Sequence, residues 1–299
     1  MTVRRARRLT THNVGLLFVL PAVVHLFVFA VLPIAYAFWV SLFDWKILRG
    51  TMPFVGLSKY SEVVRDASFW NALWNSARFA ALSVPAGMVV ALLVATLVSK
   101  ELRGSGVFRT LFYIPAVSSV VAVSMLWIYV FLPTTGLINM TTAVFGAKSI
   151  DFLNDPWWAM GSLAFMSVWT GLGPRMIIYV AGLMSIPPSL FEAADLDGAN
   201  SVAKFCHVTW PLLAPTNLFV LVTGTIAAFQ LFTPVYMMTK GGPLDSTDVV
   251  GYHIYQEAWH KFHVSTAAAQ SFLLLIVIAV LAWIQFRMMR GQLEGFSSQ

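Results

Sequence analysis

Charged residues are scarce in this chain. Only 11% of its 299 residues are Asp, Glu, Lys or Arg, whereas a soluble domain carries roughly 25%. This scarcity excludes an ordinary water-soluble fold, and 58% of the residues are hydrophobic, with 23 Phe and 11 Trp among them. The composition therefore indicates an integral membrane protein whose length is taken up by several spans of ~20 residues in one bundle.

The sequence also lacks what disulfides, metal sites and nucleotide hydrolysis require. A single cysteine, Cys206, excludes an internal disulfide and is interpreted as an inert small residue. Gly146-Ala-Lys-Ser149 lacks the upstream glycine and the order of a phosphate loop, so this chain is not expected to hydrolyse ATP itself. His253, His260 and His263 have no carboxylate or Cys at ligand spacing and are interpreted as surface residues. No catalytic residue, metal ligand or bound cofactor is predicted.

Long apolar runs predict an all-α, polytopic membrane protein with six transmembrane helices. The expected spans are residues 14–40, 71–98, 109–132, 157–185, 212–237 and 264–286. The first run is longer than the ~7–15 apolar residues of a signal peptide, so it is interpreted as an uncleaved span that Pro21 and Pro33 bend. The expected organisation is a basic N-terminus (1–13), a six-span domain (14–290) and a tail (291–299).

The positive charges predict which side of the membrane the termini face. Six spans place both termini on one side, which carries ten Lys and Arg residues against seven in the longer loops opposite. The ten are Arg4, Arg5, Arg7, Arg8, Lys100, Arg103, Arg109, Lys204, Arg287 and Arg290; the seven are Lys46, Arg49, Lys59, Arg65, Lys148, Lys240 and Lys261. By the positive-inside rule, the termini and the loop 188–210 are cytoplasmic.

The loop 188–210 is unusual because it carries three acids and one base on a side where loops are normally basic. The acids are Glu192, Asp195 and Asp197, and the base is Lys204. Such an acidic, Ala-rich element is either an amphipathic linker that caps its own helix or a contact for a basic partner surface. The second interpretation would use Glu192 or Asp195 in a salt bridge, and the spacing alone leaves both open.

Turn signals predict the shape of this loop. Ser189 and Glu192 are three residues apart, which is the spacing of a capping box at the start of a helix. Gly198 follows about two turns later and can adopt the left-handed conformation that ends a helix. Asn200 or Ser201 can then cap a second short helix. The loop is therefore expected to form two short helices joined at a glycine elbow.

The same residues resemble the EAA loop of ABC importer permeases. The matching residues are Glu192, Ala193, Ala194, Asp197, Gly198, Ala199, Phe205, Pro211, Leu212 and Pro215, whereas Val208 and Trp210 stand where Ile and Leu are usual. From about residue 14 to 290 the chain resembles the sugar-type branch of these permeases, the maltose and glycerol-phosphate permease group. Gly241-Gly242-Pro243 and residues 267–271 are secondary matches.

The resemblance implies a type I importer permease fold with a cytoplasmic coupling helix that docks in a cleft of the ATPase subunit. The implied coupling residues are Glu192, which pairs with an ATPase arginine, together with Ala193, Ala194, Asp195, Asp197 and Gly198. The implied partners are a second homologous permease, two ATPase subunits that bind ATP and Mg, and an extracytoplasmic binding protein. The expected function is half of the import pathway for a di- or oligosaccharide; the alternative is a glycerol-phosphate-type or other small polar solute.

Two arginines lie inside the expected spans, where charges are costly and usually face a cavity or a partner. Arg78 is near the end of its span and is interpreted as reaching the membrane interface. Arg175 lies 12 residues before Pro187, which places it ~18 Å into the helix at 1.5 Å per residue. Its partner is expected to be either the solute or another subunit.

A solute pathway is expected along the fourth and fifth spans. Ser167, Thr170, Gly171 and Arg175 share one helical face, and Gly224, Ala227, Ala228 and Leu231 form a face of small residues that alone would predict helix packing. The resemblance places these positions near those that line the sugar site of the maltose permease, with Gln230 one step away. The candidate pathway residues are Ser167, Thr170, Gly171, Arg175, Gly224, Ala228, Gln230 and Leu231. Trp169 and Tyr236 are aromatic candidates for sugar stacking, but a position at the membrane interface is the favoured explanation for each.

Other classes of membrane protein fit less well. A secondary transporter needs inverted repeats or ion-coupling carboxylates within its spans, and the six expected spans contain no Asp or Glu. A membrane scaffold has no need of an acidic coupling helix.

Overall fold

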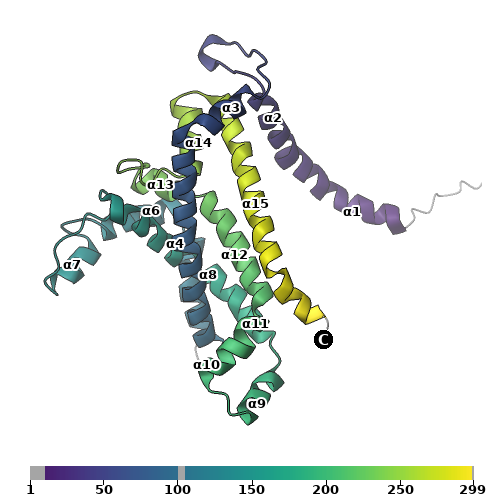
Figure 1. The fold of residues 1–299 in the computed structure, drawn as a ribbon, viewed down its shortest axis with the longest axis vertical. Helices are drawn as coiled ribbons and strands as arrows, with labels where there is room; N and C mark the ends of the chain where they lie inside the picture. Colours follow the sequence, from purple (N-terminus) through teal and green to yellow (C-terminus); the bar gives the residue numbers. More distant parts are fainter. Residues whose placement is uncertain (1–10, 100–104, 298–299) are drawn as a thin grey trace, which may run out of the picture.

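The computed structural model describes residues 11–99 and 105–297, with side chains for 18–99 and 106–289, and these residues are mainly helical (Figure 1). The first half contains α1 (Thr11–Leu26), the π-helical turn η1 (Phe27–Val31), α2 (Leu32–Ser41), η2 (Ile47–Arg49), α3 (Ser58–Arg65), α4 (Ala67–Val98), α5 (Ser105–Val117), α6 (Val120–Val130), α7 (Leu137–Ala143) and α8 (Pro156–Met184). The second half contains α9 (Pro188–Leu196), α10 (Ser201–Lys204), η3 (Phe205–Thr209), α11 (Trp210–Leu212), α12 (Ala214–Phe229), α13 (Thr233–Met238), α14 (Val250–Tyr255), η4 (Gln256–His260) and α15 (Val264–Ser297).

Four helices are long and apolar enough to cross a membrane by themselves. They cover Phe18–Ser41, Ala67–Val98, Pro156–Met184 and Val264–Met289. Two further helix pairs meet the same criterion only together: Gly106–Val117 with Val120–Val130, bent by 97°, and Ser201–Leu212 with Ala214–Phe229, bent by 67°. The six expected spans therefore correspond to four continuous helices and two broken ones.

The expected third span, residues 109–132, is broken into α5 and α6, which are bent by 97° relative to each other. Pro115 lies near the end of α5 and has no backbone N–H to donate. The chain then leaves the helix at Ser119, whose φ of −58° and ψ of 126° are not helical. Ser118 Oγ donates to the carbonyl of Ile114 at 3.0 Å, so it satisfies one of the oxygens freed at the break.

The expected fifth span, 212–237, is also too long, because α12 ends at Phe229. Phe232 has a φ of −139° and a ψ of −64°, and α13 begins after it. Pro234 explains the break, since proline lacks the N–H that a continued helix would need and its ring clashes with the preceding turn. The segment beyond α12 lies next to the broken third span, since α13 packs against α6.

The core of the bundle is formed by α4 and α8, with α5 and α12 packed beside them (Figure 1). Large side chains fill the interior, including the fully buried Phe79, Met160, Met176 and Tyr179. Glycine allows the closest helix approach: a Cβ on Gly173 of α8 would lie 2.5 Å from the carbonyl oxygen of Phe112 in α5. Such small-residue contacts are typical of helix packing in membranes.

The first span lies apart from this core (Figure 1). Its most apolar window has no buried residue, and Phe18 and Phe29 are 81% and 70% exposed. Only its end near Ser41 packs on the bundle, where the rings of Phe38 and Phe272 meet at 5.3 Å. The π-helical turn η1 lies between Pro21 and Pro33, the two residues expected to bend this span.

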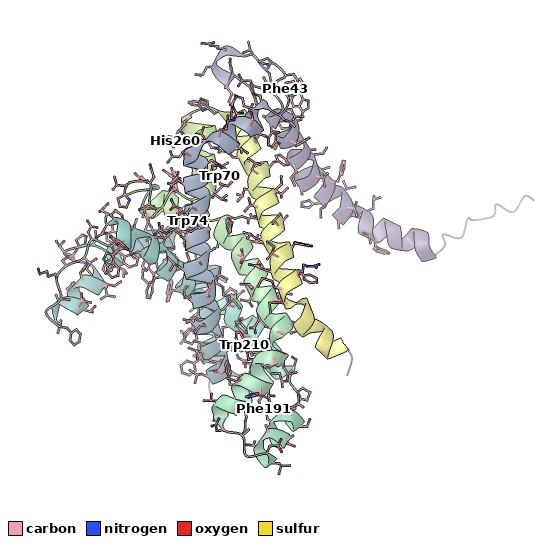
Figure 2. All side chains as sticks on the ribbon, viewed as in Figure 1. Phe43, Trp70, Trp74, Phe191, Trp210 and His260 are labelled. Atoms are coloured by element: carbon pink, nitrogen blue, oxygen red, sulfur yellow. The ribbon has the colours of Figure 1, made fainter. Side chains whose placement is uncertain are left out.

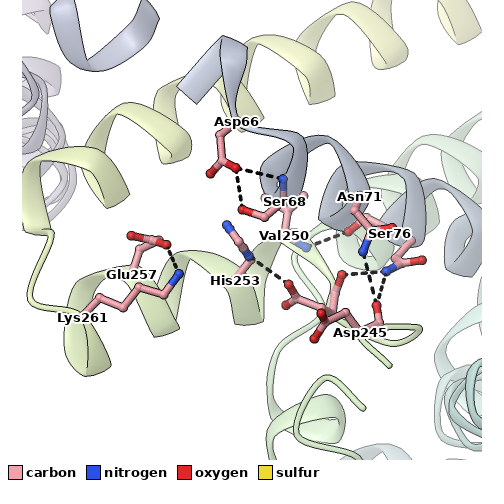
Figure 3. Close-up of polar contacts among 11 residues, drawn as sticks. Asp66, Ser68, Asn71, Ser76, Asp245, Val250, His253, Glu257 and Lys261 are labelled. Carbon is pink, nitrogen blue, oxygen red and sulfur yellow. Dashed lines mark hydrogen bonds and ion pairs between the residues drawn. The ribbon is translucent and has the colours of Figure 1, made fainter. Parts of the chain in front are cut away.

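Side-chain hydrogen bonds attach the upper end of α4 in Figure 1 to the segment before α14 (Figure 3). The amide of Asn75 donates to the carbonyl of Asp245 at 2.8 Å and to that of Asp248 at 3.1 Å. The backbone N–H of Val250 donates to Ser76 Oγ at 2.9 Å. Because all these polar groups are paired, the loop that follows α13 is held firmly against the bundle.

The interpretation of the three histidines as surface residues is wrong for His253, which is only 4% exposed. Its Nδ1 lies 2.9 Å from a carboxylate oxygen of Asp248, and Glu257 pairs with Lys261 (Figure 3). His263 Nδ1 lies 3.1 Å from the second carboxylate oxygen of Glu257. The helical turns of α14 and η4 bring these acids close, which the search for short ligand spacings missed. No group of three or more metal-ligating side chains occurs among the residues that the structure describes.

Asp66 caps α4, and its surroundings lower its pKa. Its carboxylate accepts from Ser68 N at 2.9 Å and from Ser68 Oγ at 2.7 Å (Figure 3). Burial opposes ionisation, but these two hydrogen bonds and the charges of His253 and Lys261 outweigh it, so the pKa of Asp66 is lowered from its ordinary 3.8. A carboxyl with a lowered folded-state pKa stabilises the fold above its unfolded pKa, and this stabilisation is lost as the pH falls through the folded value.

We expect Gly173→Ala to destabilise the protein by about 1–3 kcal/mol, because the new methyl would press on the backbone of α5, which cannot rotate away. The measurement is the thermal unfolding temperature of the purified complex in detergent. Gly161→Ala is the matched control, since it lies on the same helix with nothing within 4 Å of the added Cβ. A fall in unfolding temperature that is equal in both variants would contradict the packing described for Gly173.

We expect the amides in the first turn of α4 to exchange hydrogen faster as the pH falls below 4. For a helix cap worth ~1 kcal/mol, the loss of protection is about fivefold. The cause is protonation of Asp66, and the exchange is corrected for the intrinsic rate. Asp66→Asn is the control, since asparagine also caps a helix but does not titrate. If both proteins lost protection over the same pH range, the carboxylate would not be the cause.

Candidate functional site

The acidic loop starts with α9, and its beginning differs from the expected capping box. Pro188 is the first helical residue, and Pro187 precedes it in an extended conformation with no side-chain cap. Ser189 therefore lies inside the helix, where its hydroxyl cannot serve as the N-cap. Proline at the first helical position explains this start, because its missing N–H would have had no partner anyway.

The glycine elbow is confirmed. Gly198 has a φ of +71°, and its N–H donates to the carbonyl of Asp195 at 3.0 Å. The N–H of Ala199 donates to the carbonyl of Ala194 at 2.9 Å, so the two bonds together make a Schellman motif. Asn200 then caps α10 by accepting from the N–H of Ala203 at 2.8 Å.

The acidic side chains of the loop differ in whether they form an ion pair. Asp195 pairs with Lys204 and so joins α9 to α10. Glu192 and Asp197 are exposed and form no ion pair with any residue of the described segments. Of the two acids expected to contact a partner, Glu192 is therefore the one whose carboxylate is not already paired within the loop.

The loop projects from the lower end of the bundle but is seated on it (Figures 1 and 2). Phe191 of α9 packs against the buried cluster that includes Tyr179 and Leu213, and Val208 and Leu212 pack there too. A hollow of about 540 Å³ between α9 and the ends of α4 and α8 is lined in part by Glu192 and Asp195. A movement of α9 would thus be transmitted to the spans through packed side chains.

A second hollow, here called the cavity, lies where the two broken helices meet α8. Its volume is about 440 Å³. Five of the eight predicted pathway residues line it: Ser167, Thr170, Gly171, Gln230 and Leu231. The polar groups of these residues are two hydroxyls and one amide, and no charged side chain is among the lining residues. The cavity can therefore hydrogen-bond a polar solute.

The other three predicted residues do not line the cavity. Ala228 is 4% exposed within the hydrophobic core. Gly224 faces α4, where an added Cβ would lie 3.2 Å from Val84, so it packs helices as its small size alone suggested. Arg175 lies behind Gly171, between α8 and α4. Helical spacing identified three of the four α8 residues, but it did not show that Gly224 and Ala228 face the helix contacts of α12 while Gln230 and Leu231, just after α12, face the cavity.

Sequence reasoning missed the cavity residues at the helix breaks. These are Pro115, Ala116, Ser118 and Val120 of the first break, and Phe232, Thr233 and Pro234 of the second. Proline was only a partial signal, because Pro115 and Pro234 lie at breaks whereas Pro85 of α4 and Pro174 of α8 lie within continuous helices. Non-helical backbone at membrane depth is tolerated where it lines a cavity.

Trp169 and Tyr236, the two aromatic candidates, pack against different groups of aromatic rings. Trp169 is 38% exposed and meets the ring of Trp127 edge-on at 5.5 Å. Tyr236 belongs to a cluster in which Phe232 lies 5.5 Å away and Tyr255 5.4 Å away. Of these rings, only that of Phe232 lines the cavity.

Comparisons with known proteins agree with this architecture. Residues 83–290 match the family described as binding-protein-dependent transport system inner membrane component. The chain is 32% identical to the probable ABC transporter permease protein YesP of Bacillus subtilis (strain 168), over 95% of this chain and 93% of that one. It is 37% identical to the lactose transport system permease protein LacF of Rhizobium radiobacter, over 91% and 92% of the two chains.

A third relative and a solved structure extend the comparison. The chain is 32% identical to the sn-glycerol-3-phosphate transport system permease protein UgpA of Escherichia coli O6:K15:H31, over 93% and 94% of the two chains. Its fold is similar, with a TM-score of 0.79 at 23% identity over 93% and 95% of the chains, to a bacterial ABC transporter involved in the import of the acidic polysaccharide alginate. The chain thus belongs to the sugar-type permeases of binding-protein-dependent ABC importers, and it is a multi-pass membrane transport subunit.

Proposed function

We propose that this chain forms half of the pathway by which an ATP-driven importer carries a di- or oligosaccharide across the cell membrane. The cavity supports this proposal, since its hydroxyls and amide suit a polyol and it lies at the breaks of two spans. The names of LacF and UgpA support a sugar or a glycerol-phosphate-type solute, respectively. The second class is the alternative function.

The acidic loop is the coupling element for an ATPase subunit in this proposal. It projects beyond the ends of the spans (Figure 1), and two of its apolar side chains are exposed: Leu196, one turn after Glu192 on α9, by 91% and Val202 of α10 by 70%. Exposed apolar side chains around a free carboxylate suit docking in a cleft with a basic residue. The partners would be two ATPase subunits, which bind ATP and Mg, because this chain has no phosphate loop.

A second homologous permease would complete the transport unit. The unburied first span supports this, because α1 and α2 offer an apolar surface on which a neighbouring subunit and lipid can pack. The cavity is not enclosed by this chain alone, so a second subunit would supply the remaining wall.

The orientation in this proposal places both termini and the acidic loop in the cytoplasm. Lys204 is on the expected cytoplasmic side and lies in the acidic loop itself. Arg4, Arg5, Arg7, Arg8, Lys100, Arg103 and Arg290 of the charge count lie outside the residues whose side chains are described. The upper end, with α3 and α14, would then face the binding protein. The alginate transporter with similar fold was crystallised in complex with a pentasaccharide-bound periplasmic protein.

Transport by alternating access follows from these placements. ATP would close the ATPase dimer and shift the docked α9. Since Phe191 is packed against the cluster around Tyr179 and Leu213, the shift would move the α4–α8 pair as a rigid body. The observation that carries the proposal is this projecting loop, with its Schellman elbow and its free Glu192.

We expect Glu192→Lys to reduce binding-protein-stimulated ATP hydrolysis at least tenfold, because it places a positive charge against a basic ATPase surface. The assay uses the assembled complex in proteoliposomes, and membrane insertion should be unchanged. Asp195→Asn is the comparison, since it only weakens the link of α9 to α10, and its effect should be much smaller. Undiminished transport by Glu192→Lys would exclude the docking role.

We expect Gly198→Pro to impair coupling far more than Gly198→Ala does. Alanine can occupy the left-handed conformation at a cost of about 1–2 kcal/mol, and nothing lies within 4 Å of its Cβ. Proline cannot adopt a φ of +71° and also loses the N–H that donates to Asp195. The readout is the ratio of stimulated to basal ATP hydrolysis, and equal ratios in the two variants would refute the elbow.

A further inference from the structure

We propose that Arg175 makes this a pathway for a solute that carries an anionic group, either a carboxylate or a phosphate. This inference rests on the proposed transport function and specifies the solute class of the same cavity. Three observations support it: the position of the guanidinium between two helices, the absence of an acidic partner for it among the described residues, and the lack of acidic side chains in the cavity wall.

The guanidinium of Arg175 occupies a slot between two glycines on different helices. A Cβ on Gly87 of α4 would lie 2.3 Å from Nη1, and a Cβ on Gly171 of α8 would lie 2.7 Å from the same atom. Any larger residue at either position would fill the space that the guanidinium needs. The bundle is therefore shaped to hold this charged group at the α4–α8 contact.

No negative charge of the described residues neutralises Arg175. Nη1 has no accessible surface and no hydrogen-bond partner, and none of the ion pairs in this part of the chain involves Arg175. The buried hydroxyl of Tyr179, one helical turn away on α8, likewise has no hydrogen-bond partner. Arg175 as a whole is partly exposed, but a buried guanidinium nitrogen without a partner is costly. This cost favours a partner that arrives from outside the chain.

The cavity adjoins the slot of Arg175 at Gly171. Gly171 lines the cavity and also borders the guanidinium, and because glycine has no side chain, only its own atoms stand at this point of the wall. The cavity wall has no acidic side chain to repel an anion. Arginine presents a planar set of donors that matches carboxylate and phosphate oxygens, whereas a neutral sugar needs no guanidinium.

Arg78, the other arginine within the expected spans, is not enclosed between helices as Arg175 is. It lies on α4 closer to the upper end of the bundle, and its side chain is exposed. It can therefore reach the membrane interface, as expected from the sequence. Arg78→Gln is consequently the matched control for Arg175→Gln.

The test measures solute-stimulated ATP hydrolysis by the complete transporter with its binding protein in proteoliposomes. The three probes are lactose, which is neutral, a galacturonate disaccharide, which carries carboxylates, and glycerol 3-phosphate. We expect stimulation by an anionic probe, and which of the two stimulates distinguishes a carboxylate from a phosphate. Arg175→Gln should raise the KM for that probe tenfold or more, Arg175→Lys should stay within about threefold, and Arg78→Gln should equal the wild type.

Gly171→Ala is a second variant that keeps the charge but displaces the guanidinium from its slot, so it should also raise the KM for the anionic probe. Stimulation by lactose alone, or an unchanged KM in Arg175→Gln, would overturn the inference and leave the transport function standing. Loss of the partner subunits from purified Arg175→Gln would overturn it too, because Arg175 would then pair with another subunit. Absence of any stimulated hydrolysis in the wild type would instead refute the proposed function.

Discussion

The structure depends on one constraint, which is that backbone N–H and C=O groups inside a membrane must find partners within the protein. Most of the chain meets it with continuous helices. It is relaxed at the 67° bend between α11 and α12, and again after Val117 and after Phe229, where prolines interrupt the hydrogen-bond ladder. The interruptions after Val117 and Phe229 line the same cavity, together with the polar face of α8. Irregular backbone, small residues and hydroxyl groups are therefore concentrated at the place where a polar solute would pass.

The acidic loop and the cavity lie at different levels of one packed unit. Phe191 connects the loop to the buried cluster around Tyr179, and Tyr179 lies one helical turn from Arg175 on α8. The helix α8 thus has the loop at its lower end, the unpaired arginine in its middle and the cavity-lining residues Ser167, Thr170 and Gly171 above it. This continuity gives a physical route by which an event at the loop can alter access to the cavity without flexible connections.

Much of this organisation is predictable from the sequence. Apolar runs identified the spans, and Gly198 and Asn200 identified the elbow and the second cap of the loop. The failures have particular causes. A proline interrupts a helix only where neighbouring groups accept the freed backbone, so the breaks near Pro115 and Pro234 depend on tertiary structure. The pairing of His253 with Asp248 depends on the fold of α14. The position of Arg175 depends on Gly171, one turn away on α8, and on Gly87 of α4, which is far from it in the sequence.

The central claim is that the acidic loop docks on an ATP-hydrolysing partner in the cytoplasm. The most direct measurement is photo-cross-linking in cells from a benzoyl-phenylalanine placed at Leu196, the most exposed apolar side chain of the loop. The account predicts a covalent product with the ATPase subunit. A protein from the opposite side of the membrane in the cross-linked product, or no ATPase product at all, would contradict it.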